Sequence, residues 1–311
     1  MNNLICIAGP TASGKTALSI ALAKELDGEV VSCDSMQVYK GMDIGTAKPT
    51  VEEMAGIPHH MLSVAEPWED FSVGKYCQMA TPIVDDILAR GKTAIIVGGT
   101  GLYMDALVKG NDFAPVPSTG RREELEKLAT EKGIEAVIAR LRAVDPESAD
   151  RLHPSDQKRI IRAMEVFLET GDTITEHNRK TQLLPPRYNP VWFALEDADR
   201  ANLYARIDKR VEIMLEQGLI AEIQSLLDKG IPEKCTAMQA IGYKEFVDVI
   251  RGRSSMETAT ELVQQSSRKY AKRQLTWFRR NSAIHWLRRE KNERTAEILT
   301  KARQILADSD K

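Results

Sequence analysis

Residues 9–16 read Gly9-Pro10-Thr11-Ala12-Ser13-Gly14-Lys15-Thr16, directly after the apolar run Leu4-Ile5-Cys6-Ile7-Ala8. This stretch matches the pattern Gly-x-x-x-x-Gly-Lys-[Ser/Thr] in full, and a helical pattern follows it. Glycines there let backbone N–H groups approach phosphate oxygens, and the helix N-terminus adds positive potential. We therefore expect a P-loop that binds a di- or triphosphate, with Lys15 on the terminal phosphates and the Thr16 hydroxyl on Mg²⁺.

Outward from this loop, strands and helices alternate. We expect strands at 4–8, 29–33, 93–97 and 191–195, a late short strand at 283–287, and helices at 15–26 and 73–90. Such alternation predicts right-handed crossovers and a parallel sheet whose ligands lie at the carboxyl ends of the strands. The expected fold class is α/β, a P-loop NTPase-like parallel sheet core flanked by helices.

One segment departs from this alternation. Residues 115–186 open with Pro115-Val116-Pro117-Ser118, close with Pro185-Pro186 and read as helices in between. We expect a helical insertion domain at 115–186, while 1–114 and 187–311 form the catalytic core with its C-terminal helices.

Composition excludes several classes of protein. The chain has 311 residues, 42% of them apolar, and 43 Lys+Arg balance 45 Asp+Glu to a net charge of −2. These values exclude a disordered or collagen-like chain. A near-neutral total also argues against a protein that coats nucleic acid through net charge alone, although it can hide a segregated basic face.

Cysteine usage and the apolar runs predict a cytoplasmic protein. The four cysteines, at 6, 33, 77 and 235, form no Cys-x-x-Cys pair, which favours reduced thiols over zinc or a disulfide framework. No apolar run approaches the ~18 residues that span a bilayer, so no membrane partner is expected. His59-His60 has no acids or cysteines at ligand spacing, which favours a packing role in a loop.

The residues around the P-loop indicate which kind of P-loop protein this is. A motor or switch NTPase needs an apolar strand that ends in Asp, but the strand at 94–97 runs into Gly98-Gly99-Thr100-Gly101. The carboxylate instead follows the second strand, at Asp34. Because both strand ends should open onto one crevice, Asp34 and Thr100 are expected near the phosphates. Asp34 could orient Mg²⁺, act as a general base or cap the next turn. This arrangement of the strand ends resembles a small-molecule kinase or another transferase more than a motor protein.

Six stretches of the sequence resemble the bacterial tRNA dimethylallyltransferases. The stretches are 9–16, 34–49 (Asp-Ser-Met-Gln-Val-Tyr-Lys-Gly-Met-Asp-Ile-Gly-Thr-Ala-Lys-Pro), 97–103, 157–159, 241–244 and 272–278. The similarity covers essentially the whole chain. It implies transfer of a dimethylallyl group from dimethylallyl diphosphate to N6 of adenosine 37, beside the anticodon, in tRNAs reading codons that begin with U.

The resemblance also implies roles for residues. The P-loop (Gly9, Pro10, Thr11, Ala12, Ser13, Gly14, Lys15 and Thr16) would hold diphosphate as the leaving group, with Mg²⁺ as the cofactor at Thr16. Asp34 would take the proton from the adenine amine, and Thr100 would contact the substrate nucleotide. Arg210 would reach the diphosphate, although its helical spacing alone favours a solvated charge. Gln37 is a plausible amide contact for the flipped adenine.

Basic charge is concentrated near the C-terminus. Residues 262–289 hold eight basic side chains and no acid, and on a helix the first six fall within an arc of roughly 140°. Tyr270, Trp277 and Phe278 lie on the opposite side, which is more typical of core anchors than of base-stacking platforms. The resemblance and this basic arc together imply the residues that contact the tRNA anticodon stem-loop: Asp34, Ser35, Met36, Gln37, Thr100, Gln157, Lys158, Arg159, Ile160, Ile161 and Lys244 from the resemblance, and Arg268, Lys272, Arg273 and Arg279 from the arc.

Three other hypotheses remain open from the residues. A kinase would phosphorylate a small acceptor with ATP, and a second kind of prenyltransferase would use free AMP or ATP instead of tRNA. A pure RNA-binding module would leave the P-loop and Asp34 without a purpose. No obligate protein partner is expected, because the chain shows no coiled-coil heptads.

Overall fold

The computed structural model describes residues 3–111, 119–182 and 184–309. It divides into two compact units, residues 1–110 with 187–311 and Asn111–Pro186. The opening of the expected insertion, Pro115-Val116-Pro117-Ser118, lies outside the described residues. Its expected end, Pro186, is also the last residue of the second unit.

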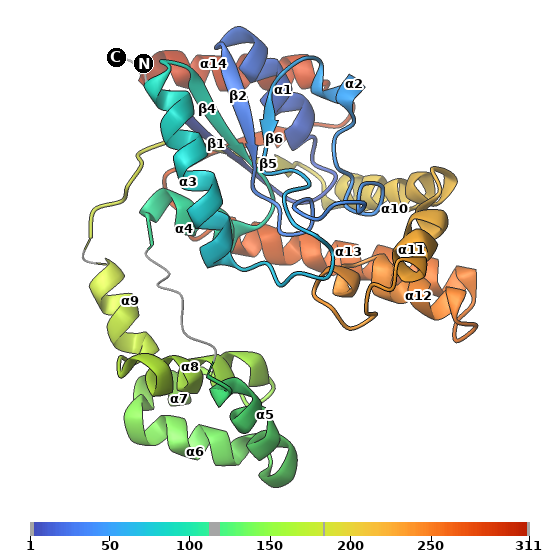
Figure 1. The fold of residues 1–311 in the computed structure, drawn as a ribbon. Helices are drawn as coiled ribbons and strands as arrows, with labels where there is room; N and C mark the ends of the chain where they lie inside the picture. The colour runs from blue at the N-terminus through green and yellow to red at the C-terminus, as the bar shows by residue number, and fades with distance from the viewer. Residues whose placement is uncertain (1–2, 112–118, 183, 310–311) are drawn as a thin grey trace. The chain divides into compact units, whose positions relative to one another are not determined.

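The first unit is built on a six-stranded, all-parallel sheet, which confirms the expected α/β fold (Figure 1). The strand order is β3-β2-β4-β1-β5-β6. The strands are β1 (Leu4–Ala8), β2 (Gly28–Ser32), β3 (His59–His60), β4 (Thr93–Val97), β5 (Val191–Asp197) and β6 (Ile284–Arg289).

The central strand β1 carries the P-loop at its carboxyl end. All five of its residues are apolar and buried, and such a continuous apolar run is typical of a parallel sheet covered on both faces. The five residues of β2 are buried as well, including Glu29 and Ser32. β1 pairs with β4 through Ile7↔Val97 and with β5 through Ala8↔Ala194. The loops that follow these strands therefore open at one edge of the sheet.

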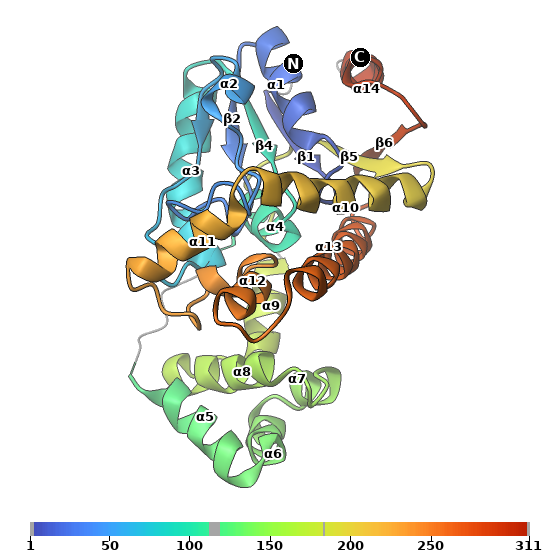
Figure 2. The same cartoon turned by 90° about the vertical axis from the view of Figure 1, so that its right-hand side faces the viewer.

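Helices cover both faces of this sheet and its carboxyl edge. The helices of the first unit are α1 (Lys15–Glu25), α2 (Val51–Met54), α3 (Val73–Ala89), α4 (Gly101–Lys109), α10 (Arg200–Glu216), α11 (Leu219–Asp228), α12 (Tyr243–Ile250), α13 (Met256–Phe278) and α14 (Thr295–Ser309), with a 3₁₀ turn at Ala237–Gln239. α1 and α14 pack on one face, with Leu18, Leu22 and Ile298 in the main core. Figure 2 shows α10 to α13 gathered at the carboxyl ends of the strands.

Two local predictions differ from the structure. His59-His60 is not a packing loop but the edge strand β3, parallel to β2 with Val30 opposite His59. The difference arises because the neighbouring strand supplies main-chain partners that a local pattern does not reveal. The late strand β6 runs from Ile284 to Arg289 and not over the expected 283–287, so Arg288 and Arg289 belong to the sheet.

A buried ion-pair cluster joins β3 to its neighbours. Glu29 on β2 accepts two hydrogen bonds from Arg90 (2.6 and 3.0 Å), and His60 Nε2 lies 2.9 Å from the same carboxylate. The Glu29 side chain is 6% exposed. The hydrogen bonds from Arg90, more than those with His60, lower the pKa of Glu29 from 4.5 to about 2.

We expect this cluster to stabilise the fold in an acid-sensitive way. The folded-state pKa is depressed, so its contribution is complete above pH 4.5 and is lost as pH falls towards about 2. Because Arg90 is 39% exposed, solvent screening limits that contribution to about 1–2 kcal/mol. Urea unfolding should show that Glu29→Gln lowers the free energy of unfolding by this amount at neutral pH. The stability of the variant should also fall less steeply than that of the parent between about pH 4.5 and about pH 2. Asp86→Asn, at a carboxylate 66% exposed, is the control; equal effects of the two variants would contradict the assignment.

The second unit is a helical bundle. Its helices are α5 (Arg121–Lys132), α6 (Ile134–Val144), α7 (Pro146–Arg151), α8 (Gln157–Thr170) and α9 (Ile174–Gln182). Leu125, Val137, Leu141 and Ile160 meet in a core of their own. No helix among the described residues of either unit combines the length and apolarity needed to span a bilayer.

Candidate active site

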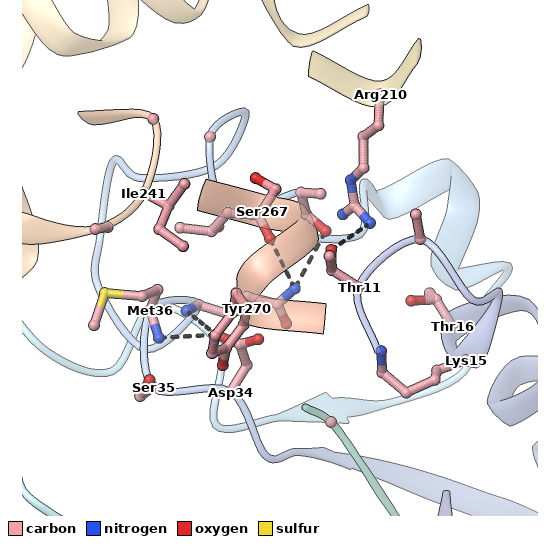
Figure 3. Close-up of a pocket in the computed structure, with 18 of the residues that line it drawn as sticks. Thr11, Lys15, Thr16, Asp34, Ser35, Met36, Arg210, Ile241, Ser267 and Tyr270 are labelled. Carbon is pink, nitrogen blue, oxygen red and sulfur yellow. Dashed lines mark hydrogen bonds between the residues drawn. The ribbon is translucent and has the colours of Figure 1, made fainter. Parts of the chain in front are cut away.

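The site is a pocket of about 520 Å³ at the carboxyl ends of β1, β2 and β4. In Figure 3, Thr11, Lys15 and Thr16 of the P-loop lie on one side, and Asp34, Ser35 and Met36 lie on the other. The lining also includes Gln37, Thr46, Ile207, Arg210, Met214, Ile241, Lys244, Val263, Ser267, Tyr270, Arg273 and Gln274. All of these residues belong to the first unit.

The P-loop has the backbone of an anion site. Gly14 begins α1 with φ 93°, a conformation that L side chains rarely adopt, and a Cβ there would lie 2.8 Å from the Arg289 guanidinium. Lys15 Nζ bends back to donate to the Pro10 carbonyl at 2.7 Å. Burial, with a smaller contribution from Arg210, lowers the pKa of Lys15 to about 8. A bound anion would offset this cost of burying two cations together.

Arg210 reaches the P-loop from α10. Its Nη1 donates to the Thr11 hydroxyl at 3.4 Å, as Figure 3 shows. Burial lowers its pKa, while Asp34 raises it. The solvated position that helical spacing favours is therefore wrong, because α10 crosses the carboxyl edge of the sheet and turns this side chain inward.

Asp34 both caps a turn and faces the pocket. One oxygen, Oδ1, accepts from the backbone N–H groups of Met36 (2.9 Å) and Gln37 (3.3 Å). No described residue donates to the other oxygen, Oδ2. The capping alternative therefore holds for one oxygen, and the second stays free for chemistry.

Thr100 is tied to the same loop. Its hydroxyl accepts from Ser35 N–H at 3.0 Å, and its own N–H donates to the Cys33 carbonyl at 3.3 Å. β2 and β4 are neighbours in the sheet. The structure thus brings Asp34 and Thr100 together, as the strand ends predict.

The Gln37 amide is already engaged by the protein. Its oxygen accepts from the Ser32 hydroxyl at 3.0 Å, and its nitrogen donates to the carbonyls of Thr46 and Ala47, both at 3.2 Å. Donation by this amide to a base would require one of the two Nε2 bonds to break, whereas its oxygen, which has two lone pairs, can accept a further hydrogen bond. Ser35 and Met36, the other members of this turn, line the pocket directly.

Acids from elsewhere in the chain neutralise part of the basic arc. Arg268 pairs with Asp208 of α10, and Arg279 pairs with Glu196 of β5 at 3.2 Å. A window of sequence without an acid could not reveal these partners. Arg273 and Lys244 line the pocket, whereas Lys272 lies at a small separate depression beside Arg279.

Two of the expected tRNA contacts need correction. Ile160 and Ile161 are 0% and 6% exposed and pack in the core of the helical unit, so their side chains cannot meet RNA. The helical period of α8 turns them inward together. Gln157, Lys158 and Arg159, by contrast, are exposed.

The aromatic side chains of α13 have different environments. Phe278 is 1% exposed in the core, and Trp277 donates its indole N–H to Asp105 at 2.9 Å. Tyr270 lines the pocket instead, so its prediction as a core anchor is wrong. Burial, then the nearby Asp34 carboxylate, raises its pKa to about 12, so its phenol stays protonated at neutral pH.

Glu222 and Gln274 also support the site, although sequence reasoning gave neither a role. The Glu222 carboxylate accepts from three successive backbone N–H groups, those of Asp43 (2.8 Å), Ile44 (2.8 Å) and Gly45 (3.1 Å). Glu222 thereby fixes the loop at residues 43–47, whose carbonyls at Thr46 and Ala47 are also hydrogen-bonded by Gln37. Gln274 lies within the 272–278 stretch noted above, which was the available signal; a lone Glu on an amphipathic helix offers none.

Comparisons with known proteins place the chain in a family. A family model described as IPP transferase matches residues 37–281, and one described as isopentenyl transferase matches 2–65. The chain is 50% identical to the tRNA dimethylallyltransferase of Geobacillus thermodenitrificans, over 91% of this chain and 89% of that one. It is 41% identical to that of Acetivibrio thermocellus, over 99% and 98%.

Solved structures give the same result. The full-length tRNA isopentenylpyrophosphate transferase from Bacillus halodurans matches with a TM-score of 0.73 at 41% identity, covering 99% of this chain and 96% of its own. A eukaryotic dimethylallyltransferase described as acting on tRNA matches with a TM-score of 0.81 at 28% identity, covering 99% and 80%. The chain therefore belongs to the IPP transferase family, the tRNA dimethylallyltransferases, transferases that prenylate an adenine of tRNA.

Proposed function

We propose that this enzyme transfers the dimethylallyl group of dimethylallyl diphosphate to N6 of adenosine 37 in tRNAs reading codons that begin with U. The products are N6-dimethylallyladenosine and diphosphate. One observation carries the proposal furthest: the P-loop with Arg210 and the free oxygen of Asp34 face the same pocket from opposite sides. That arrangement suits a reaction in which an anion leaves on one side and a nucleophile loses a proton on the other.

The cationic side of the pocket stabilises the leaving group. As the allylic C–O bond breaks, negative charge grows on the diphosphate, and Lys15 and Arg210 are the half-buried cations that line this side of the pocket. P-loop N–H groups at the start of α1 add to this stabilisation. Preorganised groups of this kind act strongly because they need little reorganisation during the reaction.

The other side accepts the proton. The exocyclic amine of adenine is a poor nucleophile, so a base must take its proton as the C–N bond forms. Asp34 Oδ2 is the available acceptor, because Oδ1 is held by the turn at Met36 and Gln37. We propose that Thr100, whose hydroxyl accepts from the Ser35 N–H, orients the incoming nucleotide together with this turn.

The protein alone offers few oxygen ligands for Mg²⁺, and the bound diphosphate would supply the others. Thr16 faces the pocket with its hydroxyl, but no group of three or more His, Cys, Asp or Glu capable of holding a metal occurs among the described residues. Mg²⁺ commonly takes a few protein oxygens and completes its shell with substrate phosphates and water. When bound by Thr16 and the diphosphate, it would neutralise charge on the leaving group.

Access to the base requires a flipped nucleotide. Adenine in a single-stranded anticodon loop unstacks at low cost, and the pocket can enclose it between Tyr270 and the Asp34 turn. Lys244 and Arg273 supply positive charge at the lining. Gln157, Lys158 and Arg159 of the helical unit are exposed and suited to the phosphates of the stem-loop.

Mass spectrometry of tRNA after incubation with each donor tests this function. We expect dimethylallyl diphosphate to add one prenyl group at adenosine 37 of an unmodified anticodon stem-loop. Phosphorylation by ATP would support a kinase instead. Prenylation of free AMP with no transfer to RNA would support the free-nucleotide enzyme, and either result would overturn the proposal.

Diphosphate binding is expected to weaken in alkali. The pKa of Lys15 is lowered to about 8, so its ammonium is lost as pH rises through that value. The dissociation constant for inorganic diphosphate, measured by calorimetry, should rise by up to about tenfold per pH unit beyond it. Lys15→Met should bind diphosphate weakly over the whole pH range and should not lose further affinity near pH 8. If the variant still lost affinity there, the titrating group would be one other than Lys15.

A further inference from the structure

Gln274 joins the two sides of the pocket through one buried amide. Its Oε1 accepts from the Thr11 backbone N–H of the P-loop at 2.9 Å, and its Nε2 donates to the Gly99 carbonyl at 3.0 Å. The residue is 5% exposed. Amide geometry matches this pair of partners, because one end must accept and the other must donate.

The chain has made room for this contact. A Cβ on Gly99 would lie 2.0 Å from Gln274 Nε2, so only glycine allows the amide to approach this carbonyl. Thr100 follows directly, and its hydroxyl holds Ser35. The connection therefore runs from the P-loop through Gln274 to Thr100 and the turn that carries Asp34.

The same amide withholds one P-loop donor from the anion. Thr11 gives its N–H to Gln274 and accepts Arg210 at its hydroxyl. Thr11 thus serves as a fixed point between α10 and α13, and diphosphate would be bound by the later members of the loop. Loss of Gln274 would leave the Thr11 N–H and the Gly99 carbonyl without their buried partner.

We propose that Gln274 is a positioning residue for prenyl transfer, which sets the separation between the diphosphate in the P-loop and the nucleotide beside Asp34 and Thr100. This inference rests on the proposed function. It predicts that Gln274 affects the chemical step more than diphosphate binding, because an error of about 1 Å between reacting groups can cost about 10²-fold in rate.

The first test separates binding from chemistry. In Gln274→Met, which matches the length but makes neither bond, we expect the single-turnover transfer rate at saturating substrates to fall at least about 30-fold. The dissociation constant for inorganic diphosphate should stay within about threefold. Gln224→Met is the matched control, because the amide of Gln224 donates only within its own helix, to Asp228 at 2.7 Å. An unchanged rate, or equal losses of rate and diphosphate binding, would overturn the proposal.

The second test uses a variant that can regain the missing bond. In Gln274→Glu, an ionised carboxylate accepts from Thr11 but repels the Gly99 carbonyl; once protonated, it can donate to Gly99 as the amide does. The transfer rate relative to the parent enzyme should therefore rise at least about tenfold as pH falls from about 8 to about 5.5, because burial raises the pKa of such a carboxyl. A flat ratio would contradict the positioning role. Absence of transfer by the parent enzyme would refute the proposed function instead.

Discussion

Asp34→Asn is expected to lower the rate of prenyl transfer by about 10²–10⁴-fold, the usual contribution of a general base. Asn is the informative replacement because its Oδ1 can still accept from Met36 and Gln37 and so preserve the turn. The amide that replaces Oδ2 cannot take a proton from the adenine amine. The variant should therefore fold, bind diphosphate and fail mainly in the chemical step.

Single-turnover transfer of a labelled prenyl group to an anticodon stem-loop measures this loss. Diphosphate binding by the same variant should not weaken by more than about threefold, because the contacts of the P-loop and Arg210 are kept and the lost Asp34 charge no longer competes with the anion for these cations. Asp43→Asn is a control on the same loop, at a carboxylate that is 59% exposed and pairs with Lys48. Full activity of Asp34→Asn would remove Asp34 as the base and point to another acceptor at the pocket.

The architecture was accessible from sequence because its signals are local. A continuous apolar run followed by Gly9–Thr16 identifies a buried parallel strand and its phosphate loop, and both match β1 and the start of α1. The edge strand β3 was missed because two residues carry no periodicity. Its pairing depends on β2, which lies far away in the sequence.

The sequence predicts the site residues that follow neighbouring strands better than those that helices bring to the pocket. Neighbouring parallel strands place Asp34 beside Thr100, and this follows from the order of elements. Arg210 and Gln274 depend on how α10 and α13 cross the sheet edge, which residue spacing within one helix does not reveal. The same limit hid the pairing of Arg268 with Asp208, because an acid on another helix is invisible to a local charge count.

Arg210→Ala should lower kcat/KM for dimethylallyl diphosphate by about 10²–10³-fold, the loss seen when one buried donor to a developing anion is removed. The arginine is hydrogen-bonded to Thr11 and faces the P-loop, and water that enters the vacated space in the variant would not supply its positive charge. Arg210→Lys should recover part of this loss, because it keeps the charge but not the planar guanidinium. Lys209→Ala is the control, since Lys209 is 62% exposed and pairs with Glu212 on the same helix.

The same variant should also leave a signature in the pH dependence. Arg210 is one of the causes that lower the pKa of Lys15 to about 8, second to burial. Its removal should therefore raise the pKa of Lys15 and move the alkaline limb of diphosphate binding to higher pH, even as binding at neutral pH weakens. Calorimetric titrations with inorganic diphosphate between about pH 7 and about pH 10 measure both effects. Weaker binding with an unmoved limb would mean that Arg210 acts without electrostatic coupling to Lys15, and unchanged binding would exclude it from the diphosphate site.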